Sequence, residues 1–183
     1  GNGCLGCHRV GVPLDPWLCP DCRKELRYLA KSPRRPNPDV LCLYAMTPLT
    51  KSLVYGLKYG NMPGLASYLV ANALREEESF ETVREWGMKL AFIPVPLHTA
   101  RMRERGYNQA EKIAFSLAGK ANGIVAHALL RKTFRVSQTK LSRTGRENNV
   151  AGAFGWKRRF RWPSGYTPII VDDVFTTGAT TTA

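Results

Sequence analysis

The sequence predicts an α/β fold, in which helices flank a mostly parallel sheet, with a small cysteine-rich module in front of it. Two observations support this class. Short apolar runs rich in β-branched residues alternate with segments whose apolar residues recur at helical spacing. Four of the five cysteines lie within the first 22 residues, ahead of a Pro-rich segment. With 183 residues, 44% of them hydrophobic, the chain has the size of one globular domain plus a small module.

The Pro-rich segment supplies the predicted domain boundary. It has no apolar periodicity and carries several basic residues, which is typical of a linker. A short helix is predicted just before it, at 25–30. We therefore expect a cysteine module at 1–30, a linker at 31–39 and the main domain at 40–183.

The first part of the main domain is predicted to contain one strand and two helices. The strand is the apolar run at 40–46. The first helix, at 48–59, has a proline at its first position, where proline is favoured. The second helix is expected at 65–78, with apolar residues at helical spacing.

The second part of the main domain alternates strands and helices again. A strand at 90–96 precedes a helix for which Asn108 and Glu111 have the spacing of a capping box. A short strand within 124–130 follows, and 131–152 is predicted as a long loop or a loose hairpin. The last predicted strand is 168–174, and the carboxyl ends of these strands are the expected place of function.

The cysteines form two C-x-x-C pairs, Cys4 with Cys7 and Cys19 with Cys22. At this separation two such knuckles can bring four thiolates onto one tetrahedral Zn²⁺. So short a segment has little core of its own, so metal ligation would stabilise it. Two disulfides or free thiols are the alternatives, and disulfides fit poorly with a chain in which no export signal is seen. Cys42 is expected to be a buried thiol.

The last predicted strand ends in two adjacent carboxylates and opens into a turn rich in hydroxyls. Hydroxyls and backbone N–H groups at the start of a helix suit a phosphate. Carboxylates suit diol hydroxyls or a hydrated Mg²⁺. An ordinary strand–turn–helix is the alternative. The residues of this predicted site are Asp172, Asp173, Val174, Thr176, Thr177, Gly178, Ala179 and Thr180.

Positive charge is concentrated in one half of the chain. The net charge is +13, and residues 101–161 hold fifteen Lys/Arg and three Glu, a net of +12. Such asymmetry favours a polyanionic partner, either pyrophosphate or nucleic acid. Arg101, Arg103 and Arg105 follow the strand at 90–96, and we expect them to form a second anion site on the same edge of the sheet. A solvated basic surface is the alternative.

Aromatic and basic residues alternate between Trp156 and Trp162, with four cations among three aromatics. This pattern is typical of a platform for single-stranded nucleic acid, with Arg158 and Arg159 on phosphates and the two tryptophans under bases. The alternative is a strand edge whose aromatics pack on the core while its cations face water.

The strand, the two acids and the Thr-Thr-Gly-Ala-Thr turn together resemble the phosphoribosyl pyrophosphate (PRPP) motif of type I phosphoribosyltransferases. The resemblance implies that Asp172 and Asp173 face the ribose hydroxyls, with Mg²⁺ accompanying PRPP, and that 176–180 holds the 5-phosphate. It also implies that the arginines at 101–105 bind pyrophosphate. The chain ends three residues after Thr180, so we expect the C-terminal part of such a core to be missing, through truncation or because the natural chain is short.

The order of motifs is similar to that of the ComF (competence protein F) family. The cysteine module, Pro-Val-Pro-Leu-His, Arg-Gly-Tyr-Asn-Gln and the acidic pair occur in that order. This resemblance implies a cytoplasmic protein of DNA uptake in natural transformation that binds PRPP and incoming single-stranded DNA, alongside other DNA-uptake proteins. The alternatives are an active phosphoribosyltransferase, which releases pyrophosphate to an unknown acceptor, and a DNA-binding protein that has kept only the fold. No apolar run approaches the ~18 residues of a membrane span, so no membrane insertion is expected.

Overall fold

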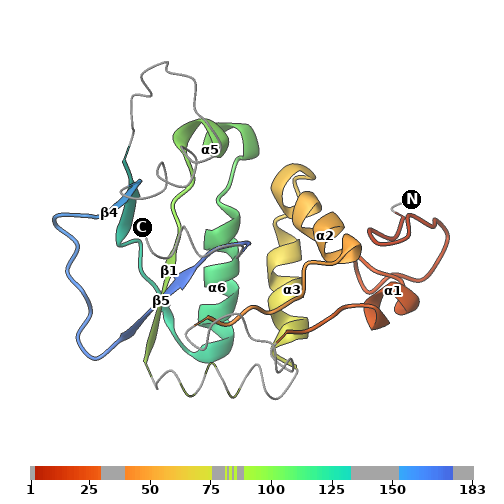
Figure 1. Cartoon of the computed structure of the whole chain (residues 1–183), viewed down its shortest axis with the longest axis horizontal. Coiled ribbons are helices and arrows are strands. Elements are labelled where there is room, and N and C mark those ends of the chain that lie inside the picture. Colours follow the sequence, from red (N-terminus) through yellow and green to blue (C-terminus); the bar gives the residue numbers. More distant parts are fainter. Residues whose placement is uncertain are drawn as a thin grey trace, which may run out of the picture. The chain divides into compact units, whose positions relative to one another are not determined.

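The computed structural model describes residues 3–29, 40–75, 81, 83, 85, 89–132 and 153–174. The chain divides into two compact units, Gly1–Met88 and Lys89–Ala183 (Figure 1). The predicted linker at 31–39 lies outside the described residues, so the domain boundary placed there stays a prediction.

The N-terminal unit begins with the cysteine module, whose helix α1 (Pro20–Lys24) starts on a proline. The helix predicted at 25–30 and the strand predicted at 40–46 are both wrong in their described parts. Glu25 instead closes α1, and the segment after it pairs locally with the predicted strand through one antiparallel bridge, Tyr28 to Tyr44. Pro20 favours a helix start at that position, and the long-range contact of Tyr28 with Tyr44 competes with a helix in the residues that follow.

Two helices complete the described part of this unit. Helix α2 (Pro48–Tyr59) has the predicted bounds, and the Thr47 side chain caps it by accepting from the Thr50 N–H. Helix α3 (Gly64–Ala73) ends five residues before its predicted end. Three glutamates follow at 76–78, and negative charges are unfavourable in the last turn of a helix, where the helix dipole is itself negative. The cysteine module packs on α2, where the Ser52 hydroxyl donates to the Leu5 carbonyl at 2.8 Å.

The C-terminal unit is built on a parallel three-stranded sheet of order β2-β1-β5. The strands are β1 (Leu90–Pro94), β2 (Ile124–Val125) and β5 (Thr167–Val171), and every residue of the central β1 is buried. Helix α6 (Gln109–Ala121) packs on β1 through small buried residues, Ala110, Ala114 and Ala118. The predicted parallel α/β fold with an N-terminal cysteine cluster is therefore confirmed.

A second, two-stranded sheet joins β3 (Leu129–Arg131) and β4 (Phe154–Trp156) in antiparallel register. The single strand predicted within 124–130 is thus two strands, β2 and β3, because the backbone turns between them, with the Ala128 N–H bonded to the Ala126 carbonyl. Within the described part of the chain, no helix is long and apolar enough to cross a membrane.

Candidate metal centre and anion-binding edge

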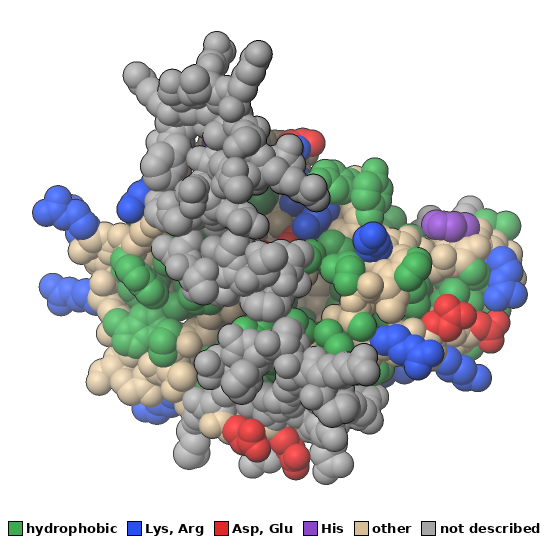
Figure 2. Space-filling view, in the orientation of Figure 1, with side chains coloured by type: hydrophobic (Ala, Val, Ile, Leu, Met, Phe, Trp, Pro, Cys, Tyr) green, Lys and Arg blue, Asp and Glu red, His purple; other side chains and the backbone are tan. Residues whose placement is uncertain are grey.

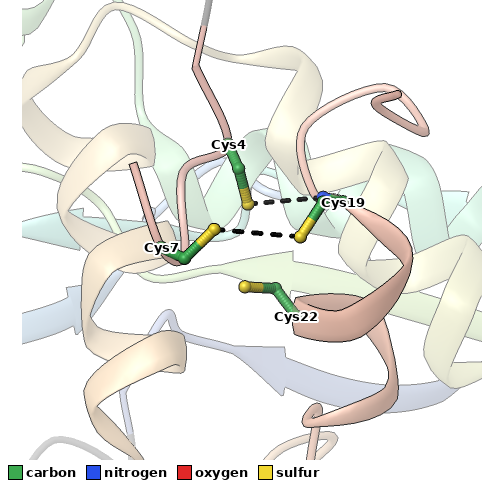
Figure 3. Close-up of side chains that lie close together, drawn as sticks. All are labelled: Cys4, Cys7, Cys19 and Cys22. Carbon is green, nitrogen blue, oxygen red and sulfur yellow. Dashed lines mark hydrogen bonds between the residues drawn. The ribbon is translucent and has the colours of Figure 1, made fainter. Parts of the chain in front are cut away.

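The four cysteines of the two knuckles converge on one point (Figure 3). Their sulfur atoms all lie within 4.8 Å of one another, and Cys7 Sγ is 3.8 Å from Cys19 Sγ. A tetrahedral zinc with Zn–S bonds of about 2.3 Å requires sulfur separations of about 3.8 Å. All five cysteines are described, and none forms a disulfide. The cluster could therefore hold a metal ion such as zinc.

Backbone N–H groups from both knuckles donate to the sulfur of Cys4. The N–H groups of Gly6 and Cys19 point at Cys4 Sγ, at 3.4 and 3.3 Å. Gly6 is also the place of closest approach, because a Cβ added there would lie 2.8 Å from Cys22 Sγ. The first knuckle therefore depends on glycine for space.

One cation contacts the cluster directly and was not predicted. Arg9 Nε donates to Cys7 Sγ at 3.3 Å, and its Nη2 is 3.1 Å from Asp21 Oδ2. Cys7 is the one exposed ligand, and Arg9 lowers its pKa to about 6. The signal was present in the sequence as a basic residue two positions after a ligand.

The buried sulfurs are arranged for a bound cation. Burial raises the pKa of Cys22, and the neighbouring sulfurs raise it further. Burial also acts to raise the pKa of Cys4, but the N–H groups of Cys19, Cys7 and Gly6 outweigh it and the net shift is downward. Four thiolates this close repel one another, and a divalent cation would remove that cost.

The acidic pair lies at the carboxyl end of β5, half-buried, where it was predicted. The Asp173 N–H donates to Asp172 Oδ1 at 2.8 Å. The neighbouring β1 ends at the same level, because Val171 pairs with Pro94 and its carbonyl accepts from the Val95 N–H at 2.9 Å. Val174 is described and half-buried, whereas the predicted phosphate turn at 176–180 lies outside the described residues.

The three arginines predicted to form the second anion site lie on a short helix, α5 (Thr99–Arg105), which Figure 1 shows beyond the carboxyl end of β1. The His98 side chain caps it, and Gly106, at φ 75°, ends it. Arg101 and Arg105 share one face of α5, but Arg103 is turned about 200° from each of them. The structure thus brings two of the three predicted arginines to one side.

The Arg105–Gln109 motif forms the turn between α5 and α6. Arg105 Nη1 donates to the buried Gln109 at 2.9 Å, and Tyr107 is buried. Asn108 caps α6 through the Ala110 N–H, as predicted, and also donates to the Val95 carbonyl at 2.9 Å. Arg101 forms an ion pair of 2.8 Å with Glu104. These contacts fix both helices to the end of β1.

A further pair at this edge was not predicted. His127, which follows β2, lies 3.5 Å from Glu111 near the start of α6. The two residues are sixteen positions apart in the sequence, with most of α6 between them, so only the fold brings them together.

The aromatic and basic segment after β4 is divided by the structure. Trp156 is 60% exposed, whereas Phe160 packs against the core of the C-terminal unit. The Trp162 N–H donates to the Tyr166 carbonyl at 3.1 Å, and its ring lies 6.1 Å from that of Phe160. Arg158 and Arg159 are exposed.

The chain is similar in sequence to several known proteins whose names refer to competence or to the use of DNA. The chain is 28% identical over 195 residues to a Haemophilus influenzae protein named competence protein F, covering 98% of the chain and 81% of that protein. It is 30% identical to the DNA utilization protein YhgH of Salmonella typhimurium, covering 89% of the chain and 74% of the relative. The YhgH protein of Escherichia coli K12 is 29% identical, with 97% of the chain and 79% of the relative covered. No family model matches the chain, and no solved structure does.

Proposed function

Because the chain belongs to the ComF (competence protein F) family, we propose that it acts in DNA uptake during natural transformation, as a cytoplasmic protein that binds PRPP and single-stranded DNA. The names of the relatives support the role in DNA uptake, and other uptake proteins are its expected partners. The observation that carries the PRPP part is the acidic pair at the carboxyl end of β5, next to the end of β1.

PRPP has groups that match this edge. The carboxylates of Asp172 and Asp173 would face the ribose hydroxyls and the Mg²⁺ that accompanies the diphosphate. The hydroxyls of 176–180 would hold the 5-phosphate. Arg101 and Arg105, on one face of α5, would bind pyrophosphate, with Arg103 assisting from outside.

The metal of the cysteine cluster is proposed to be a structural Zn²⁺. Four sulfur donors with tetrahedral spacing suit zinc, and no position is left for a substrate. The ion would hold Cys4, Cys7, Cys19 and Cys22 together and so stabilise the module against α2.

Single-stranded DNA is the second proposed ligand. Its support is the concentration of charge at 101–161 together with the exposed Trp156, Arg158 and Arg159. Trp162 is the weaker of the two proposed stacking residues, since its ring and its N–H already have partners.

Calorimetry with PRPP and Mg²⁺ tests the first ligand. We expect binding by the wild-type chain, and a loss of at least tenfold in affinity in Asp172→Ala and in Thr177→Val. Asp15→Asn is the control, because Asp15 is an exposed acid that pairs with Arg23 in the other unit. Unchanged affinity in both test variants would remove the PRPP site from the proposal.

A further inference from the structure

The ribbon formed by β3 and β4 and the turn after it carry a dense group of exposed cations. Its strands and the turn after them hold six exposed cations: Arg131, Lys132, Lys157, Arg158, Arg159 and Arg161. Segments 129–132 and 153–163 contain no acidic residue. Figure 2 shows basic side chains projecting at the left edge of the view, with a group of hydrophobic side chains beside them.

The register of the ribbon determines which side chains share a face. Leu129 pairs with Trp156, and Arg131 pairs with Phe154. Paired residues and residues two apart point to the same side of an antiparallel sheet. Trp156, Phe154, Arg131 and Leu129 therefore lie on one face, although more than twenty residues of sequence separate the two β3 residues from the two β4 residues.

Two flat surfaces are available on this face. The Trp156 ring is 60% exposed. The Arg131 guanidinium lies over the Phe154 ring, 5.3 Å from its centre. Both an indole and a guanidinium plane can stack on a nucleobase. Along β4, two residues span about 7 Å, so the two surfaces are close neighbours.

The ribbon is anchored to the core of its unit at its Leu129 end, next to Trp156, and through the turn that follows β4. Leu129 and Phe160 pack against a buried cluster that includes Ile93 and Ala128, and the Lys157 N–H donates to the Ala128 carbonyl at 2.9 Å. Trp162 belongs to this anchored part, with its ring beside Phe160 and its N–H on the Tyr166 carbonyl. A stacking surface that is already ordered loses less entropy when it binds.

The geometry points to a single-strand binding platform on the ribbon face, where Trp156 and the Arg131–Phe154 pair stack bases and the turn at 157–159 contacts phosphates. Trp162 is a structural residue of this platform and contacts no base. This inference rests on the proposed binding of single-stranded DNA, and it differs from the sequence interpretation by adding Arg131 and Phe154 and by removing Trp162.

Fluorescence anisotropy with a labelled oligothymidine, measured over a series of salt concentrations, tests the platform in the full chain. Trp156→Ala should weaken binding about 5- to 150-fold, the equivalent of ~1–3 kcal/mol per stacked base, with an unchanged salt slope. Trp162→Phe keeps a ring beside Phe160 and should bind like the wild type. Arg131→Lys keeps the positive charge but loses the planar guanidinium group, and it should weaken binding. The matched control Arg161→Lys should bind like the wild type.

The outcomes separate this inference from the proposal on which it rests. If the wild type does not bind at low salt, both are overturned. If the wild type binds but Trp156→Ala binds equally well, or if Trp162→Phe loses as much as Trp156→Ala, the platform is wrong while DNA binding stands. A blue shift or quenching of tryptophan fluorescence on binding that persists in Trp162→Phe and disappears in Trp156→Phe would support the platform independently.

Discussion

Replacing Gly6 with alanine should weaken metal binding although Gly6 is not a ligand. The added Cβ would lie 2.8 Å from Cys22 Sγ, 2.8 Å from Leu49 Cδ1 and 3.0 Å from Cys22 Cβ. Leu49 can move aside, because only the end of its side chain is involved. Cys22 cannot, since its sulfur must keep its place in the tetrahedron.

The size of the effect follows from the cost of overpacking, typically about 1–3 kcal/mol. If most of this cost falls on the bound state, zinc affinity should fall about 5- to 150-fold. Competition against a chromogenic zinc chelator measures the affinity directly. The double variant Cys4→Ser, Cys22→Ser sets the level of binding expected without a complete ligand set.

Gly64→Ala is the matched control for this prediction. It adds the same methyl group in the same unit, but the nearest atom, Trp17 Cζ2, is at an ordinary contact distance of 3.4 Å. Zinc affinity equal to the wild type in both variants would refute the reasoning. Equal loss in both would show that the effect is a general one on the unit.

Three further predictions concern contacts outside the sulfur cluster itself. Arg9→Ala should weaken zinc binding about tenfold or more in the same competition assay, whereas Arg23→Ala, which removes a cation paired with Asp15, should not. Asn108→Ala should lower the free energy of unfolding in urea by about 2 kcal/mol, because it removes the helix cap (about 1 kcal/mol) and the hydrogen bond to the Val95 carbonyl (about 1 kcal/mol). Asn108→Asp keeps the cap and should lose only the contribution of the hydrogen bond to Val95. The double variant Arg158→Ala, Arg159→Ala should reduce the log–log salt slope of single-strand binding by about 0.7 for each phosphate that is no longer neutralised, and an unchanged slope would mean that neither arginine meets a phosphate.

The features that could be predicted from the sequence are set by local interactions. The bounds of α2 follow from Pro48 at its start and from apolar residues at helical spacing, both of which lie within the helix itself. The cysteine cluster follows from ligand spacing, and the cap of α6 from Asn108. The helix, its cap and each cysteine pair depend on residues only a few positions apart, and eleven residues separate the two cysteine pairs.

The features that could not be predicted depend on distant residues or on weak local signals. The described residues after Glu25 form no helix, and Tyr28 forms a bridge with Tyr44, sixteen residues further on. Helix α5 has no buried residue, so it carries no apolar period; its ends come from the His98 cap and from Gly106. The Arg9 contact with Cys7 requires the knuckle to be folded before it can form.

The basic residues show most clearly what a charge pattern leaves undetermined. The sequence assigned Arg101, Arg103 and Arg105 one common role, yet a helix turns Arg103 away from the other two and sets Arg105 against Gln109. Similarly, Trp156 and Trp162 are equivalent in the sequence pattern, but Trp156 is 60% exposed, whereas Trp162 is 37% exposed and donates a hydrogen bond to the Tyr166 carbonyl. Composition therefore favours a polyanionic partner for this half of the chain, and only the packing of each side chain indicates which residues are able to contact such a partner.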